Sequence, residues 1–166
     1  MMTLLSLTVC TIVTMLLHEL GHLIAARSCN VAASELGLGL GRRLCGFRVK
    51  SIAFSLRLVP LGSFVRLDGT ALKQLSVEKQ LFVHLAGVAV NLALGLATYG
   101  TMLGWINLLV AGGNVLPLYQ HDGWKCGVVL MRALLRRQSR SVEWAFTFSG
   151  GFVSVVIGWA VVRLFI

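Results

Sequence analysis

Charge is scarce in this chain, and acidic charge is the scarcest. Charged residues make up 13% of the 166 positions and hydrophobic residues 57%, and only six residues are Asp or Glu. The mean hydropathy is +0.83. This composition excludes an ordinary soluble domain. It predicts a polytopic α-helical membrane protein.

Cysteine pairs and nucleic-acid-binding patterns are also missing. The four cysteines (10, 29, 45 and 126) include no C-x-x-C pair, so neither a cysteine-bound metal nor a disulfide is expected. The net charge of +9 comes with no interleaving of aromatic and basic residues, which argues against a nucleic-acid partner. The basic residues instead cluster in segments between apolar stretches. That distribution is typical of cytoplasmic loops that contact anionic lipid.

The uncharged stretches predict about four transmembrane helices, at about residues 3–26, 81–103, 105–122 and 144–166. A basic loop follows the first stretch, so the end of that span should lie in the cytoplasm. Four crossings then place both termini on the non-cytoplasmic side of a multi-pass protein. No repeat or second domain is visible, and residues 1–166 are expected to form a single domain.

Between the first two spans the periodicity changes from that of a helix to that of a strand. Leucines and glycines alternate over residues 36–41, and apolar and polar residues alternate over 51–58. We therefore expect a small membrane-associated β-sheet within about residues 35–67. It either packs as a lid over the helices or offers an exposed edge onto which an extended substrate adds as a strand.

Two features are expected near the third span. Gly112, Gly113 and Pro117 should loosen its helix, and irregular backbone at membrane depth is tolerated where it lines a site or a wet cavity. The segment 114–122 should therefore face a site. Beyond it, apolar and basic residues alternate with helical spacing, which predicts an amphipathic basic helix over about residues 125–140 at the cytoplasmic surface.

The chemistry centres on the sequence His18-Glu19-Leu20-Gly21-His22 inside the first span. On a helix, residues four apart share a face, so His18 and His22 can hold one metal ion between them. Glu19 is placed to take a proton from water at that metal. The alternative, helix residues whose polar ends reach a partner or the membrane surface, leaves a charged Glu in apolar surroundings without a role.

A hydrolytic zinc site normally has three protein ligands and an open position. The remaining candidates are Asp122, His121 and His84. Asp122 ends the loosened segment, at a depth similar to that of the histidine pair. His121 is its neighbour but would point elsewhere on most backbones, and His84 is expected near a membrane interface.

These residues carry a resemblance to a known family. HELGH in a first span, with Asn114-x-x-Pro117-x-x-x-x-Asp122-Gly123 in a later one, resembles the site-2 protease family of intramembrane zinc metalloproteases. The resemblance implies one zinc ion held by His18, His22 and Asp122. It implies Glu19 as general base and acid, and Asn114 at the scissile peptide or its oxyanion.

The chain also departs from the family pattern. The sequence Ala86-Gly87-Val88-Ala89-Val90-Asn91 lacks the proline of the family's Ala-Gly-Pro-x-x-Asn, so Asn91 either lines the site or makes a helix-packing hydrogen bond. The turn near Gly100 has no room for a PDZ insertion. No regulatory domain is expected after the last span, so gating should come from the sheet, the basic helix or another chain.

The sequence therefore predicts a zinc-dependent intramembrane endopeptidase that cuts single-span membrane proteins on the cytoplasmic side of the bilayer. A regulatory partner or a homo-oligomer remains open. The alternative is a non-catalytic membrane scaffold or binding protein that retains a metal site. A metal transporter is disfavoured, because a base beside a fixed ligand pair is unlike a relay of carboxylates.

Overall fold

The computed structural model describes residues 2–135 and 140–165. A long first helix, α1 (Met2–Ser28), leads into two strands, β1 (Ala33–Val49) and β2 (Ile52–Leu67). A short helix, α2 (Gly69–Gln74), precedes four more helices: α3 (Val77–Ala97), α4 (Met102–Val115), α5 (Asp122–Leu135) and α6 (Arg140–Phe165). The expected arrangement, helices with a β-rich segment after the first, is therefore present.

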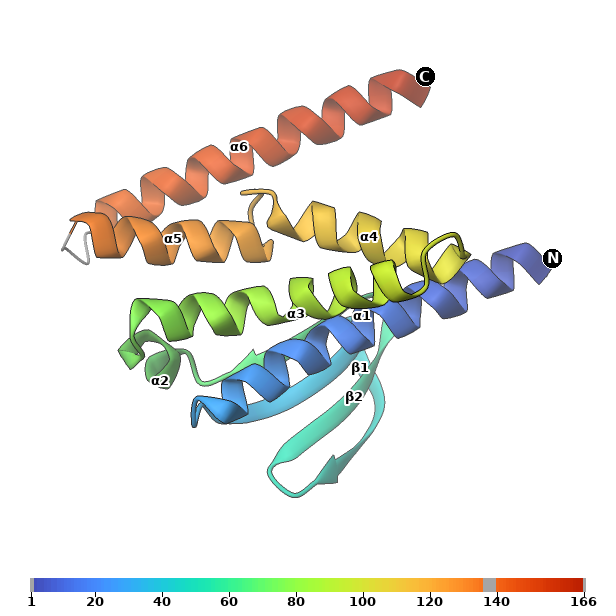
Figure 1. Ribbon diagram of the computed structural model, residues 1–166, viewed down its shortest axis with the longest axis horizontal. Coiled ribbons are helices and arrows are strands. Elements are labelled where there is room, and N and C mark those ends of the chain that lie inside the picture. Colours follow the sequence, from blue (N-terminus) through green and yellow to red (C-terminus); the bar gives the residue numbers. More distant parts are fainter. Residues whose placement is uncertain (1, 136–139, 166) are drawn as a thin grey trace.

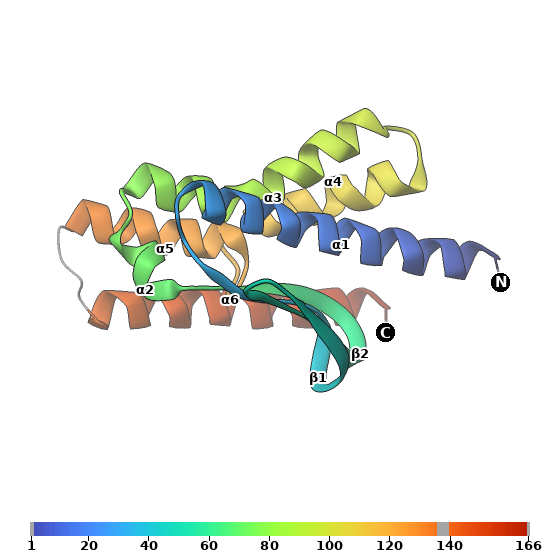
Figure 2. The same ribbon diagram turned by 90° about the horizontal axis from the view of Figure 1, so that it is seen from below.

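Helix α3 lies at the centre of the helical layer and contacts α1, α4 and α5. Helices α4 and α5 follow one another along α3, separated by an irregular stretch, while α6 stands apart from α4 (Figure 1). The beginning of α1 and the end of α6 lie at the same end of the molecule, as Figure 2 also shows. This arrangement is compatible with the four crossings that the sequence predicts.

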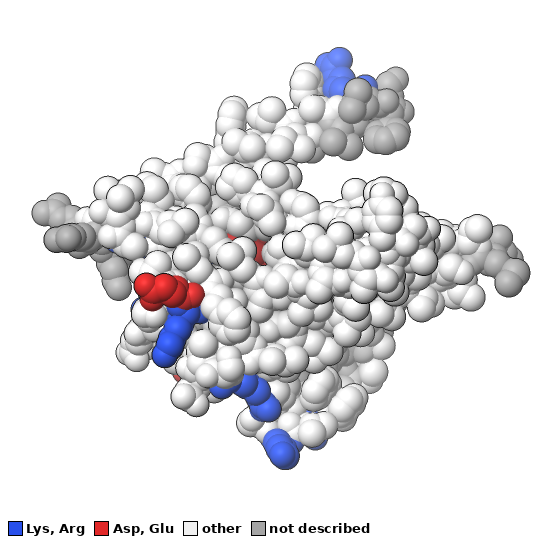
Figure 3. Space-filling model, viewed as in Figure 1, with Lys and Arg blue, Asp and Glu red and all other residues white. Residues whose placement is uncertain are grey.

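Two of the described helices, Thr3–Ser28 and Val77–Ala97, are long and apolar enough to cross a membrane. Large apolar side chains are exposed on α1, α3, α4 and α6. In the view of Figure 3, most of the surface over α1, α3 and α4 carries no charged side chains, an acidic patch lies at the start of α3, and basic side chains gather towards the hairpin. Exposed apolar surface of this extent suits contact with lipid rather than with water.

The third predicted span differs most from the structure. Helix α4 ends at Val115, so residues 105–122 are not one helix, and α4 with 14 residues is short for a crossing. The helix continues through Gly112 and Gly113, where the sequence predicts it to loosen, and ends just before Leu116, whose extended backbone is the one favoured before Pro117. The segment predicted to be loose is irregular from Leu116 to His121.

The amphipathic basic helix predicted over 125–140 is also shifted. Helix α5 begins at Asp122 and ends at Leu135, and it buries Cys126, Val128 and Val129 against its neighbours. One face of α5 is therefore packed against the other helices. Residues 136–139 of the predicted helix lie outside the described part of the chain.

The two strands form one antiparallel sheet with bulges. Leu36 pairs both with Val65 and with Phe54, so the first half of β1 lies between the two halves of β2. In the described residues, the second half of β2 has pairing partners on one side only, which leaves it as an edge. The several short strands that the alternation suggests are thus joined into two long, bent ones.

The core that fixes the site is small and surrounds the second half of α1. Leu23 packs with Ala33, Leu36 and Ile52 of the sheet. On the other side, a second buried cluster joins α1, the strand entrance and α3. Its members are Ala25, Ala26, Val31 and Val83. Both clusters hold α1 against its neighbours beside the HELGH turn.

Candidate active site

The two histidines of HELGH lie on one face of α1, as their spacing predicts. His18 and His22 are 6% and 5% exposed, in the middle of the molecule. Their Nε2 atoms are 3.1 Å apart, and their rings meet edge to face with centroids 4.7 Å apart. Both ligating nitrogens therefore point at one place.

Asp122 reaches that place from the first residue of α5. Its Oδ2 atom lies 2.9 Å from Nε2 of His18 and 3.1 Å from Nε2 of His22, and the residue is 1% exposed. The irregular stretch 116–121 turns the chain between α4 and α5 and brings the carboxylate inward. A carboxylate in the first turn of a helix is also favoured by the helix dipole.

The geometry fits a metal ion. Among the described residues, His18, His22 and Asp122 form the only group of three or more His, Cys, Asp or Glu side chains close enough to share one. Tetrahedral zinc bound at 2.0–2.1 Å needs ligand atoms about 3.3–3.4 Å apart, only slightly more than the spacing here. Two imidazole nitrogens and a carboxylate oxygen that face one point can offer their lone pairs to one cation.

Each of the three side chains has a further partner behind it. Nδ1 of His22 lies 2.8 Å from the carbonyl oxygen of Val83, and Nδ1 of His18 lies 3.1 Å from the amide of Asn91. The ammonium of Lys125 donates to Oδ1 of Asp122 at 2.9 Å. Such outer contacts orient metal ligands in known sites, so this group has the support that a metal centre needs.

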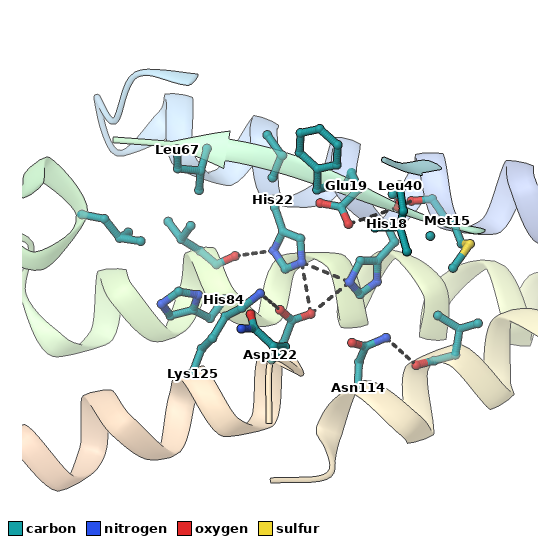
Figure 4. Close-up of a pocket in the computed structure, with 18 residues that line it drawn as sticks. Met15, His18, Glu19, His22, Leu40, Leu67, His84, Asn114, Asp122 and Lys125 are labelled. Atoms are coloured by element: carbon teal, nitrogen blue, oxygen red, sulfur yellow. Dashed lines mark hydrogen bonds and ion pairs between the residues drawn. The ribbon is translucent and has the colours of Figure 1, made fainter. Parts of the chain in front are cut away.

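Glu19 lies next to the histidines and is half-buried. Its Oε1 atom accepts a hydrogen bond of 3.1 Å from the hydroxyl of Ser63, which also reaches the carbonyl oxygen of Met15 at 3.1 Å. Ser63 belongs to β2, so the sheet touches the predicted base directly. Figure 4 shows Glu19 beside the ligand group without taking part in it.

A cavity of about 550 Å³ connects these groups. It is lined by residues from α1, from the edge segment of β2, from α3, and from both sides of the α4–α5 break (Figure 4). Ser63, Phe64 and Val65 lie on that edge. An extended peptide in the cavity would therefore have both a strand edge and the ligand group within reach.

The other predicted site residues fall in different places. Asn114 lines the same cavity, and its Nδ2 donates to the carbonyl oxygen of Val110 at 3.0 Å. Asn91 is fully buried behind His18. Of the rival ligands, His84 lines the cavity, while Nδ1 of His121 lies 3.3 Å from the carbonyl oxygen of Tyr119. Neither rival belongs to the group of potential ligands in the described residues.

Sequence reasoning missed four contributors to the site: Ser63, Val83, Gly87 and Lys125. A Cβ atom on Gly87 would lie 2.5 Å from Nε2 of His22 and 2.8 Å from Nε2 of His18. Lys125 could have been found from its position one helical turn after Asp122. The contacts of Ser63 and Val83 depend on packing between distant elements, and no local signal marks them.

Comparison with known proteins identifies a family for most of the first two thirds of the chain. The model of peptidase family M50 matches residues 6–103, which include HELGH and Asn91 but not Asn114 or Asp122. Two similar relatives are each named zinc metalloprotease RasP. The protein from Bacillus licheniformis is 34% identical over 61 residues, and that from Geobacillus kaustophilus is 38% identical over 52.

These matches cover a limited part of each protein. They span 37% and 31% of this chain, and 15% and 12% of the Bacillus and Geobacillus proteins. Another relative, from Clostridium acetobutylicum, is 32% identical over 90 residues, with 26% of its own length matched. The chain thus matches about a quarter or less of the length of these curated relatives.

Proposed function

Because the chain belongs to peptidase family M50, we propose that it is a zinc-dependent endopeptidase that hydrolyses peptide bonds within the membrane. The observation that carries this proposal is the convergence of His18, His22 and Asp122 beside Glu19. The three ligands come from two separate helices of an apolar bundle and meet beside a cavity. The family match does not include Asp122, so its assignment as the third ligand rests on this geometry.

His18, His22 and Asp122 would hold the zinc ion through two Nε2 atoms and Oδ2. When bound, zinc supplies a Lewis acid that polarises the scissile carbonyl and makes water more acidic. Three protein ligands would leave room at the ion for water or substrate, as in catalytic sites rather than structural ones. Lys125 offsets the negative charge of Asp122 and keeps its Oδ1 occupied, so that Oδ2 faces the histidines.

Glu19 would act as the general base and then as the general acid. Its carboxylate accepts a proton from the attacking water and delivers it to the departing amine. The Ser63 hydroxyl donates to Oε1 and so limits the rotation of the carboxylate. The second N–H of the Asn114 amide is available to donate to the developing oxyanion, because its hydrogen bond to Val110 uses only one.

The substrate would be a membrane protein with a transmembrane segment that can unwind locally. A peptide bond inside a helix is inaccessible, and unwinding it in an apolar medium leaves backbone groups without partners. The β2 edge that lines the cavity can supply hydrogen bonds to that backbone by strand addition. Helix-weakening residues near the cut should therefore favour cleavage.

We further propose that the chain is a multi-pass protein with four crossings. Helices α1 and α3 would each cross once, α4 and α5 together would make the third crossing, and α6 the fourth. The basic loops then place the cavity on the cytoplasmic side and both termini on the other. This topology puts the ligand group where an unwound transmembrane segment could meet it.

Co-expression with a single-span reporter substrate tests this function. The substrate should carry a Gly- or Pro-containing transmembrane segment, with a rigid Leu-rich segment as the comparison. The wild-type chain should cut the first and spare the second. Glu19→Gln should abolish cleavage while zinc stays bound, since Glu19 is not a ligand.

Glu78→Gln is the matched control, because Glu78 is an exposed carboxylate at the start of α3 away from the cavity. It should cleave like the wild type. Cleavage that persists in Glu19→Gln would overturn the enzyme proposal. Bound zinc with no cleavage by the wild type would instead favour the alternative, a membrane protein that retains a metal site without catalysis.

A further inference from the structure

One face of α3 serves both histidines of α1. Val83, Gly87 and Asn91 follow one another at intervals of four residues and so form a single stripe. The carbonyl of Val83 faces Nδ1 of His22, and the side chain of Asn91 faces Nδ1 of His18. Gly87 lies between them and leaves room for both Nε2 atoms.

The Asn91 side chain is held in a fully buried position. It is 0% exposed, and its Nδ2 lies 3.1 Å from Nδ1 of His18, while its Oδ1 has no hydrogen-bond partner among the described residues. The oxygen and nitrogen ends of an amide have the same shape, so rotation by 180° exchanges them without disturbing the packing.

The choice of amide end decides which His18 nitrogen carries the proton. With the oxygen end towards His18, Oδ1 accepts from Nδ1–H and the lone pair of Nε2 points at His22 and Asp122. With the nitrogen end there, Nδ1 must be the acceptor, and the proton moves to Nε2, which then cannot bind a metal. For His22 there is no such ambiguity. Its Nδ1 faces the carbonyl oxygen of Val83, which can only accept a hydrogen bond, so the proton lies on Nδ1.

We propose that Asn91 is a positioning residue that accepts the Nδ1–H of His18 and thereby fixes the tautomer and ring orientation that bind the metal. This inference rests on the metal site of the proposed function, but not on its protease activity. It assigns Asn91 to the metal centre rather than to the substrate or the oxyanion. Asn91 performs for His18 the task that the backbone of Val83 performs for His22.

Zinc affinity of the purified full-length chain in detergent tests the inference, measured by competition with a chromophoric chelator. Asn91→Leu keeps the size and removes the acceptor, so zinc binding should weaken about 10- to 100-fold. Asn91→Asp keeps an acceptor and should bind zinc at least as tightly as the wild type. Recovery by an aspartate is not expected if Asn91 only fills space.

Asn107→Leu is the matched control. Asn107 is also fully buried, also has an Oδ1 without a partner in the described residues, and also bonds to α1, through Thr14 at 3.0 Å. It does not touch either histidine, so its leucine variant should keep wild-type zinc affinity. Equal losses in Asn91→Leu and Asn107→Leu would attribute the effect to helix packing and overturn the inference.

The inference would also be overturned if Asn91→Leu bound zinc as tightly as the wild type, or if Asn91→Asp bound zinc tenfold more weakly. If Asn91→Leu does not fold, the zinc affinity of Asn91→Ser tests the inference instead, because the short serine hydroxyl cannot reach His18. A tenfold weaker zinc affinity of Asn91→Ser supports the inference, and a zinc affinity equal to that of the wild type refutes it. A wild-type chain that binds no zinc ends both this inference and the proposed function, whereas one that binds zinc without cleaving ends only the latter.

Discussion

At the scale of single residues, one strict spatial requirement of the ligand group falls on a position without a side chain. Any Cβ at Gly87 would lie closer to the two Nε2 atoms than real Cβ atoms approach their neighbours. The ligand group therefore depends on glycine in α3 as much as on histidines in α1. Bulk at this position must push the rings away from Asp122.

Gly87→Ala should weaken zinc binding by about 10- to 100-fold, the range expected when the groups that position metal ligands are changed. Gly112→Ala is the control, since a Cβ there meets no atom within 4 Å and alanine favours helix. Chelator competition on both variants measures the difference. Unchanged zinc affinity in Gly87→Ala would contradict the described arrangement of α1 and α3.

The sequence was informative about some site residues and silent about others, for physical reasons. His18, Glu19 and His22 share one helical turn, so their spacing alone places them together. Asp122 could only be a candidate, since its approach depends on how α4 and α5 break. The outer contacts of Ser63 and Val83 could not be predicted, because a hydroxyl or a backbone carbonyl carries no signature of its distant partner.

At the scale of elements, the sheet is tied together around one carboxylate. Glu35 in β1 accepts hydrogen bonds from Ser55 at 2.6 Å and Arg57 at 3.2 Å, and Arg66 lies 3.3 Å away. These partners come from both halves of β2. The hydrogen bond from Ser55 lowers the pKa of Glu35 most, and the hydrogen bond from Arg57 and the charges of both arginines lower it further, while burial opposes the shift.

Glu35→Gln should destabilise the sheet by about 1–2 kcal/mol at neutral pH, because the amide keeps an acceptor and loses only part of the roughly 1.5–3 kcal/mol that hydrogen bonds to a charged group contribute. A lowered folded pKa means that this stabilisation is present above the ordinary carboxyl pKa of about 4.5 and is lost as the pH falls. Hydrogen exchange of β1 and β2 at matched pH measures it. A difference between wild type and variant that stays constant down to pH 3 would contradict the role of the charged form.

The period-two alternation over 35–67 predicts extended structure, and the structure confirms it. It does not predict that two strands of 17 and 16 residues bend so that β1 lies between the halves of β2. That bend depends on bulges, at which alternation is interrupted. The register, and with it the edge that faces the cavity, is therefore a tertiary property.

At the scale of the whole molecule, the positions of the chain ends and turns follow from the number of crossings. Cysteine labelling in intact cells tests them, in a variant whose four native cysteines are replaced by alanine. Tyr99, exposed in the turn between α3 and α4, should label with a membrane-impermeant reagent as Tyr99→Cys. Arg48→Cys, exposed on the hairpin, should label only after permeabilisation.

The reverse labelling pattern would contradict the orientation, and labelling of both sites in intact cells would contradict a crossing by α3. Composition predicts a membrane protein because it reports how much apolar surface the chain carries. Composition could not place the proposed third crossing, since residues 116–121 interrupt the helical structure and both α4 and α5 pack against α3. The path of the third crossing remains a prediction, and labelling at position 99 tests the side of the membrane on which it begins.

The central claim is that one zinc ion joins two imidazoles from α1 to a carboxylate from α5. The zinc K-edge X-ray absorption spectrum of the purified chain, with metal content measured on the same sample, tests it most directly. We predict one zinc per chain with two imidazoles and an oxygen ligand at about 2.0–2.1 Å. A spectrum that lacks the imidazole signature, or one that is unchanged in His22→Ala and Asp122→Ala, would contradict the claim.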